Sequence, residues 1–253
     1  METAALRNTL VFTYRSLLKA VKNPESFMDI TIMPILFTLM FTFLFGGAVS
    51  GDIQSYLPII IPGILTLTCV MASGNAGAQL REDADKSITA RFKAMPIARI
   101  APLAGALTAD LARYAVAGII VFAVGGILGL RPQAGFWAVL ASIGFMMVLG
   151  WCLSWLFSFV ALKVKSAATA SSFTMIISFP LMFLSNGFSP TSTMPVPLRF
   201  FADNINPLSK AVTAIRQLLD QGTIGTDFWL ALAGAAVILA VFIPLTMHAY
   251  RKA

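Results

Sequence analysis

Charged residues are scarce in this chain, and their scarcity excludes an ordinary soluble fold. Asp, Glu, Lys and Arg make up 11% of the 253 residues, and hydrophobic residues make up 58%. Soluble domains carry about 25% charged residues. The mean hydropathy of the chain is +0.83. We therefore expect an integral membrane protein.

Groups that carry catalysis or bind metals are also few. The chain has 1 histidine, His248, so a Ser-His hydrolase or a multi-histidine metal site lacks its parts. Its 2 cysteines, Cys69 and Cys152, form no C-x-x-C motif and predict neither a metal site nor a disulfide. The P-loop signature is absent, as is any Gly-Lys pair. Any ATP that drives this protein must therefore bind to a partner.

Apolar stretches near bilayer length divide the chain into six candidate spans. A hydrocarbon core of roughly 30 Å is crossed by about 20 apolar residues in a helix. The predicted spans are Met28 to Gly46, Leu57 to Ala78, Pro102 to Leu130, Gly135 to Leu162, Ala167 to Phe188 and Phe228 to Tyr250. The third and fourth are long, so we expect their ends to lie in the membrane interface.

Lysine and arginine residues are concentrated in alternate loops. One side of the predicted membrane has Arg131, Arg199, Lys210 and Arg216, and the remaining 14 of the 18 fall on the other side. By the positive-inside rule, both termini are cytoplasmic. Basic loops that face the cytoplasm and anionic lipid explain the net charge of +7, which requires no nucleic acid.

The segment before the first span has the pattern of an amphipathic helix. Between Leu6 and Val21, apolar residues recur at helical spacing, and basic residues occupy much of the remaining surface. The Asn-Pro pair at 23–24 breaks this pattern just before the span. We therefore favour a separate helix over 1–27 that lies in the headgroup plane, over a mere flank of the first span.

The loop between the second and third spans, residues 79–101, is long for a plain connection. Its acidic residues come first and its basic residues last, which suits a short helix through the macrodipole. Ile88, Phe92 and Met95 then fall along one face, and Pro96 ends the helix. Apolar side chains with a charged border are typical of a docking element, although a solvated loop is the simpler alternative.

Polar residues inside predicted spans are candidates for function, because they are costly in lipid. Asp110 and Arg113 are spaced i, i+3 on the third span and can pair on one helix face. We favour a structural ion pair over a transported-ion site. The second and fifth spans mix hydroxyl or amide groups with Met and Phe, and small polar residues also serve helix packing.

Two groups of motifs stand out in the chain. The first is ITARFKAMPIAR at 88–99, followed by APLAGAL at 101–107 and DLARY at 110–114. The second is NPLS at 206–209, followed by AIR at 214–216. Together they resemble type-2 ATP-binding-cassette exporter permeases, especially the daunorubicin/doxorubicin-resistance membrane subunits. The order and positions of these motifs extend the resemblance over essentially the whole chain.

The resemblance implies an all-α integral membrane protein with a single permease domain over 1–253. It implies six transmembrane helices, an amphipathic in-plane helix at the N-terminus and a cytoplasmic coupling helix. It also implies short extracellular or re-entrant helices within 189–227, a segment too apolar for a free loop. The simpler alternative for 189–227 is an interfacial loop packed on the outer leaflet.

The resemblance also implies partners and sites. The permease would assemble as a homodimer or heterodimer in the cell membrane with two copies of a separate ATPase subunit, which binds ATP and Mg²⁺, while this chain binds no cofactor or metal and has no catalytic residue. In such permeases the second and fifth spans line the dimer cavity. The expected ATPase-coupling residues are Glu82, Arg91, Phe92 and Met95, and the expected substrate path is Thr66, Asn75, Met175, Phe179, Met182 and Phe183.

The expected function is export of a hydrophobic or amphiphilic small molecule such as a drug or antibiotic. Export of a lipid or lipid-linked glycan is the alternative within the same family. An ATP-independent channel or transporter is less favoured, because the sequence has neither charged rings nor paired broken helices. A membrane enzyme would need a convergent catalytic set, for which Asp110 and Arg113 are the candidates.

Overall fold

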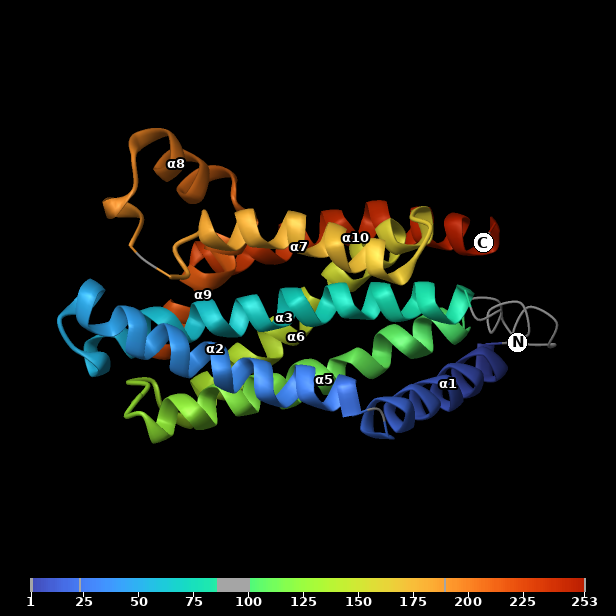
Figure 1. Ribbon diagram of the computed structural model, residues 1–253, viewed down its shortest axis with the longest axis horizontal. Coiled ribbons are helices and arrows are strands. Elements are labelled where there is room, and N and C mark those ends of the chain that lie inside the picture. The colour runs from blue at the N-terminus through green and yellow to red at the C-terminus, as the bar shows by residue number, and fades with distance from the viewer. Residues whose placement is uncertain (1, 23, 86–100, 189, 253) are drawn as a thin grey trace.

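The computed structural model describes residues 2–22, 24–85, 101–188 and 190–252, and the elements within these ranges are helical (Figure 1). The order is α1 (Glu2–Lys22), α2 (Pro24–Ser50), α3 (Ile53–Asp85), α5 (Ala101–Ile127), α6 (Gly135–Lys163), α7 (Ala167–Phe183), a 3₁₀ turn (Thr191–Thr193), α8 (Val196–Phe200), a π turn (Phe201–Ile205), α9 (Pro207–Gln221) and α10 (Thr226–Lys252).

Five of the described helices are long and apolar enough to cross a membrane: Ile30–Ser50, Ile53–Asp85, Ala101–Ile127, Gly135–Lys163 and Thr226–Tyr250. Each overlaps a predicted span, and Ile53–Asp85 extends beyond both ends of the predicted Leu57 to Ala78. The remaining predicted span, Ala167 to Phe188, corresponds to α7, which has 17 residues and ends at Phe183. After Phe183 the chain tightens into a turn, in which the Ser185 N–H donates a 3.1 Å hydrogen bond to the Met182 carbonyl oxygen.

The long helix α3 lies at the centre of the bundle. It packs against α2, α5, α6, α7 and α9, and in Figure 1 it runs between α7 on one side and α2 and α5 on the other. Glycines on α3 permit the close approach. A Cβ atom at Gly63 would overlap the carbonyl oxygen of Gly187, and one at Gly74 would overlap the side chain of Thr174. Neighbouring helices therefore contact the α3 backbone directly.

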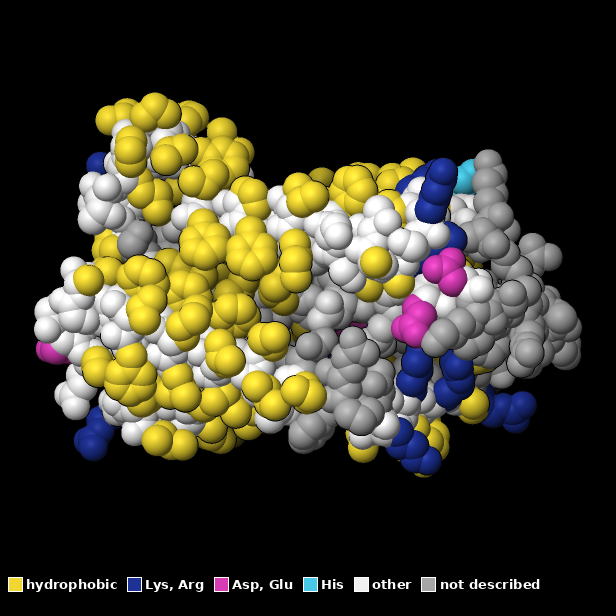
Figure 2. All heavy atoms as spheres, in the orientation of Figure 1, with side chains coloured by type: hydrophobic (Ala, Val, Ile, Leu, Met, Phe, Trp, Pro, Cys, Tyr) yellow, Lys and Arg dark blue, Asp and Glu magenta, His cyan; other side chains and the backbone are white. Residues whose placement is uncertain are grey.

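The loop between the second and third predicted spans begins later than the sequence predicts. Residues from Gln79 to Asp85, which we assigned to the 79–101 loop, form the last turns of α3. Acidic groups at a helix C-terminus oppose the macrodipole, but here they pair with cations. Arg81 lies 2.7 Å from Asp85, and Lys19 lies 2.8 Å from Asp83. Charged side chains gather at this end of the molecule in Figure 2, whereas hydrophobic ones cover its middle.

The N-terminal segment forms the predicted helix, α1, which packs against α5 and α2. Its contact with α5 is tight, because a Cβ atom at Gly105 would lie 2.5 Å from the Cβ of Phe12. The apolar side chains of Leu10, Tyr14 and Val21 are exposed on the other side of α1. The helix is thus held by the bundle and still presents an apolar face outward.

Two short α-helices, α8 and α9, form within the predicted 189–227 segment. α9 is amphipathic and packs against α3, α6 and α10. Asn206 caps its first turn by accepting a 3.0 Å hydrogen bond from the Leu208 N–H, and Gly222 ends it with a φ of 66°. Pro207 fits at the first helical position, where no N–H is needed. The Asn-Pro-Leu motif therefore sets where α9 begins.

Candidate functional site

A cavity of about 330 Å³ lies between α2, α3, α5 and α7. Its wall combines apolar side chains with hydroxyl, amide and guanidinium groups. The lining residues are Ile30, Met33, Phe37, Thr68, Met71, Ala72, Asn75, Gln79, Arg113, Ala117, Ser171, Thr174, Met175 and Phe179. We call this space the larger cavity.

Three of the residues expected along the substrate path line the larger cavity: Asn75, Met175 and Phe179. Phe183 lies beside it. Its ring stacks on that of Phe179 with centroids 5.8 Å apart and on that of Phe188 with centroids 5.0 Å apart. Phe179 and Phe183 remain partly exposed, whereas Phe188 packs against the core, so this aromatic stack runs from the cavity wall to the core.

Thr66 and Met182 lie outside the lining of the larger cavity. Both are fully buried: Thr66 donates a 2.8 Å hydrogen bond to the Pro62 carbonyl oxygen, and Met182 packs with Leu67 and Leu208. Thr66 and Asn75 are nine positions apart on one helix. Nine residues make two and a half turns at about 3.6 residues per turn, so these two side chains point in opposite directions.

The sequence predicted only part of the α3 face that lines the larger cavity: it placed Asn75 on the substrate path but not the other lining residues of α3. Thr68, Ala72, Asn75 and Gln79 follow helical spacing and form one stripe along α3. The signal was present in that spacing, but several α3 faces carry polar groups, and the sequence did not indicate which face is open. On α2, Met33 and Phe37 complete the wall from a helix to which we had assigned no function.

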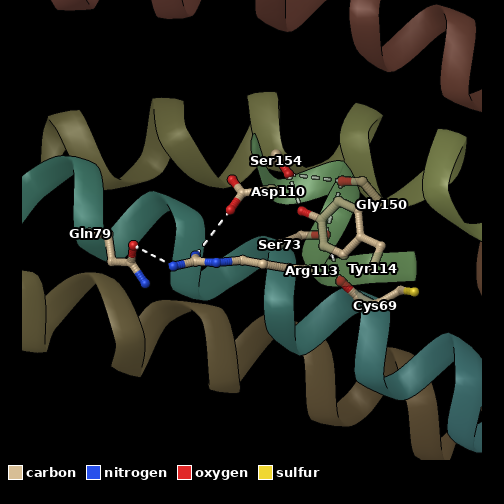
Figure 3. A network of polar contacts seen from close by, with 8 residues as sticks. All are labelled: Cys69, Ser73, Gln79, Asp110, Arg113, Tyr114, Gly150 and Ser154. Carbon is tan, nitrogen blue, oxygen red and sulfur yellow. Dashed lines mark hydrogen bonds and ion pairs between the residues drawn. The ribbon is translucent and has the colours of Figure 1, made fainter. Parts of the chain in front are cut away.

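The ion pair that the i, i+3 spacing predicts is present and buried (Figure 3). Arg113 Nη1 lies 3.0 Å from Asp110 Oδ1, and Arg113 Nη2 donates a 3.0 Å hydrogen bond to Gln79 Oε1 on α3. The second contact was not predicted, because Gln79 lies on another helix. Burying a charge in lipid requires such partners, so α5 presents its arginine at a fixed place in the wall.

A second polar group next to Arg113 joins three helices (Figure 3). Tyr114 Oη lies 2.5 Å from Ser154 Oγ, which donates to the Gly150 carbonyl oxygen at 2.9 Å. Ser73 Oγ donates to the carbonyl oxygens of Cys69 at 2.6 Å and of Gly150 at 3.0 Å. These bonds fix α3, α5 and α6 relative to one another. They help to hold Arg113 in place, and the residues that form them do not line the larger cavity.

The predicted coupling residues are only partly within the described chain. Glu82 is half-buried on the last turns of α3 rather than on a separate coupling helix. Arg91, Phe92 and Met95 lie outside the described residues.

On the opposite end of the bundle, Arg216 of α9 donates 3.1 Å hydrogen bonds to the carbonyl oxygens of Ile59 and Asn186.

Comparison with known proteins decides the family. The model of the ABC-2 type transporter family matches residues 7–219. This chain belongs to the ABC-2 type transporter family. It is also 37% identical over 251 residues to the daunorubicin resistance ABC transporter permease protein DrrB1 of Streptomyces coeruleorubidus, a match that covers 98% of this chain and 87% of that protein. Family membership and the apolar helices together identify an ABC-2 permease that crosses the membrane several times.

Proposed function

We propose that this ABC-2 permease is the membrane subunit of an ATP-driven exporter for a hydrophobic or amphiphilic small molecule. The larger cavity carries the proposal. Its volume of about 330 Å³ falls within the range of small-molecule sites. Met and Phe side chains in its wall can re-pack around ligands of different shape. Similarity to a daunorubicin resistance permease supports a drug-like substrate.

In this proposal the energy comes from a separate subunit. The chain contains no P-loop signature, so two copies of an ATP-binding-cassette ATPase bind ATP and Mg²⁺ and dock on the cytoplasmic face. The segment 86–100 follows α3 directly and provides the docking element, with Phe92 and Met95 as its apolar contacts. Lys19 of α1, paired with Asp83, lies close to the point where this segment begins.

The proposed topology has six spans. α7 is the fifth, because 17 residues is the lower end of the length that crosses a bilayer. Six spans place both termini on one side, and the basic loops assign that side to the cytoplasm. α1 then lies in the cytoplasmic interface, and α8 and α9 lie on the outer side. A second permease copy completes the translocation path.

ATP-dependent transport by the assembled complex tests this function. The tagged permease is purified from its native membranes, and any P-loop ATPase bound to it is identified. Inverted vesicles that contain both proteins should then accumulate an amphiphilic dye when ATP is supplied. The matched control is the same ATPase with its P-loop lysine replaced by alanine. Accumulation that needs no ATP, or that persists with the control ATPase, would contradict the proposal.

A further inference from the structure

Arg113 and Gln79 form a partition between two cavities. The larger cavity lies between α2, α3, α5 and α7, and a second cavity of about 50 Å³ lies between α1, α3, α5 and α10. Arg113 and Gln79 are the residues that line both. Their 3.0 Å hydrogen bond connects α5 to α3 at this boundary. The Arg113 side chain therefore borders both cavities, although the residue is largely buried.

The two sides of the partition differ in charge. Asp110, the counter-ion of Arg113, lines the smaller cavity together with Arg15, Lys19 and Asp83. Among the side chains that the structure describes along the wall of the larger cavity, Arg113 is the charged one. A ligand in the larger cavity thus meets a positive group at close range, while the neutralising carboxylate lies behind it. In a site shielded from water, this arrangement favours an anion and disfavours a cation.

The hydrogen-bonding groups of Arg113 also suit an anionic ligand. A guanidinium carries five N–H groups in a fork that matches a carboxylate or phosphate. The contacts to Asp110 and Gln79 use one N–H from each of two nitrogens. Away from Arg113, the wall is built from apolar side chains such as Met33, Phe37 and Met175. The cavity therefore has one polar end and an apolar body.

We propose that the larger cavity binds a small acidic amphiphile, with its carboxylate or phosphate on Arg113 and its apolar body against α2 and α7. Arg113 is then a specificity-determining residue that selects acidic over cationic amphiphiles. The importance of this selection for transport rests on the proposed export function. The binding itself does not. A volume of about 330 Å³ is at the low end of small-molecule sites, which favours a free small molecule over a bilayer lipid.

Photolabelling of the intact permease tests this binding without any transport step. The protein is placed in phosphatidylcholine nanodiscs and exposed to an alkyl carboxylate that carries a diazirine in its chain. The comparison probe is the alkylammonium of the same length and diazirine position. Labelled residues are located by peptide mass spectrometry. The carboxylate should label the α2 and α7 wall about tenfold more strongly, because a hydrogen bond to a charged group is being gained.

Neutralising the pair should abolish this preference. The double variant Arg113→Gln/Asp110→Asn removes both charges and leaves no unpaired buried ion. We expect it to label equally with the two probes. Arg113→Lys keeps the positive charge and should retain a reduced preference. Arg131→Gln makes the same chemical change at an exposed position and should label as the wild type does.

Three results would overturn the proposal. The first is measured on the wild-type protein and so does not depend on the folding of any variant. Equal labelling of the wild-type wall by the two probes would remove the acidic preference. Displacement of the carboxylate by phosphatidylglycerol in the nanodisc would assign the site to a bilayer lipid. An unchanged preference in a folded Arg113→Gln/Asp110→Asn variant would exclude Arg113. If labelling follows our expectation while ATP-dependent export fails, the binding site stands and only the proposed function is wrong.

Discussion

Lys19 of α1 and Asp83 of α3 form an ion pair of 2.8 Å. It joins the N-terminal helix to the last turns of α3, just before the segment proposed to dock on the ATPase. Their side chains are 39% and 22% exposed, so the pair contributes little to stability, about 0–1 kcal/mol. We expect the pair to matter through its location, because it connects α1 to the end of α3, next to the proposed docking segment.

Reversing the charge of Lys19 should therefore impair transport more than stability. Lys19→Glu places two like charges together, pushes α1 away from α3 and should lower ATP-dependent transport. The unfolding midpoint of the purified protein should change little. The swapped variant Lys19→Glu/Asp83→Lys should restore much of the transport. A swap that transports no better than the single variant would mean that the pairing is unimportant.

Asn206 should be important for stability. Its side chain caps α9 and also donates hydrogen bonds to the carbonyl oxygens of Leu181 at 2.6 Å and Leu184 at 3.0 Å. Asn206→Ala loses a cap worth about 1 kcal/mol and removes the donor to two part-buried carbonyl groups, at a cost of up to about 1–3 kcal/mol. We expect a clearly lower unfolding midpoint in detergent.

Asn204→Ala is the matched control for Asn206. Asn204 is exposed and donates a 3.1 Å hydrogen bond to the Phe200 carbonyl oxygen within the same turn. Its replacement should shift the unfolding midpoint only slightly, because water can replace that bond. Equal midpoints for the two variants would contradict a structural role for the Asn-Pro-Leu motif.

The architecture was more accessible from sequence than the cavity, and particular residues show why. Hydropathy located each long apolar helix because lipid contact depends on composition. It did not place the end of α3 at Asp85, since charged residues such as Arg81 and Asp83 leave the apolar window while the helix continues. Hydropathy indicates where a helix leaves the bilayer, whereas local ion pairs and backbone hydrogen bonds determine where the helix ends.

Contacts within one helix were predictable, and contacts between helices were not. The i, i+3 spacing of Asp110 and Arg113 predicted that they can pair, and they do. The role of Gln79 as second partner depends on how α3 rotates against α5, which no local pattern encodes. The same rotation decided that Thr68 lines the larger cavity and Thr66 does not. Packing geometry therefore selected the site from among several plausible polar faces.

The docking segment can be tested directly, although Phe92 and Met95 lie outside the described residues. Replacing both with Asp should leave membrane insertion intact but prevent association with the ATPase, because charged groups would enter an apolar groove. Co-purification from detergent measures the association. Replacing both with Leu keeps the apolar character and serves as the control. Normal association of the Asp variant would show that docking occurs elsewhere.

Cysteine labelling tests the proposed orientation. After Cys69 and Cys152 are replaced, a single cysteine at Asp52 or Asp203 should react with a membrane-impermeant thiol reagent added to intact cells. One at Lys86 or Lys252 should react only after the cells are opened. The expectation follows from the basic loops, which assign both termini to the cytoplasm. Labelling of Lys86→Cys in intact cells would reverse the orientation.

Substrate preference after truncation of Phe179 tests the central claim, that the larger cavity is the substrate path. Phe179 lines it and is 37% exposed, whereas Ile176 on the same helix is 66% exposed and lies outside the lining. Export of a panel of amphiphiles is measured for Phe179→Ala and Ile176→Ala at equal protein levels. We predict an altered preference for Phe179→Ala alone, because an aromatic contact of about 0.5–1.5 kcal/mol is lost. Unaltered preference in both variants, or loss of Phe179→Ala from the membrane as expected for a core residue, would contradict the account.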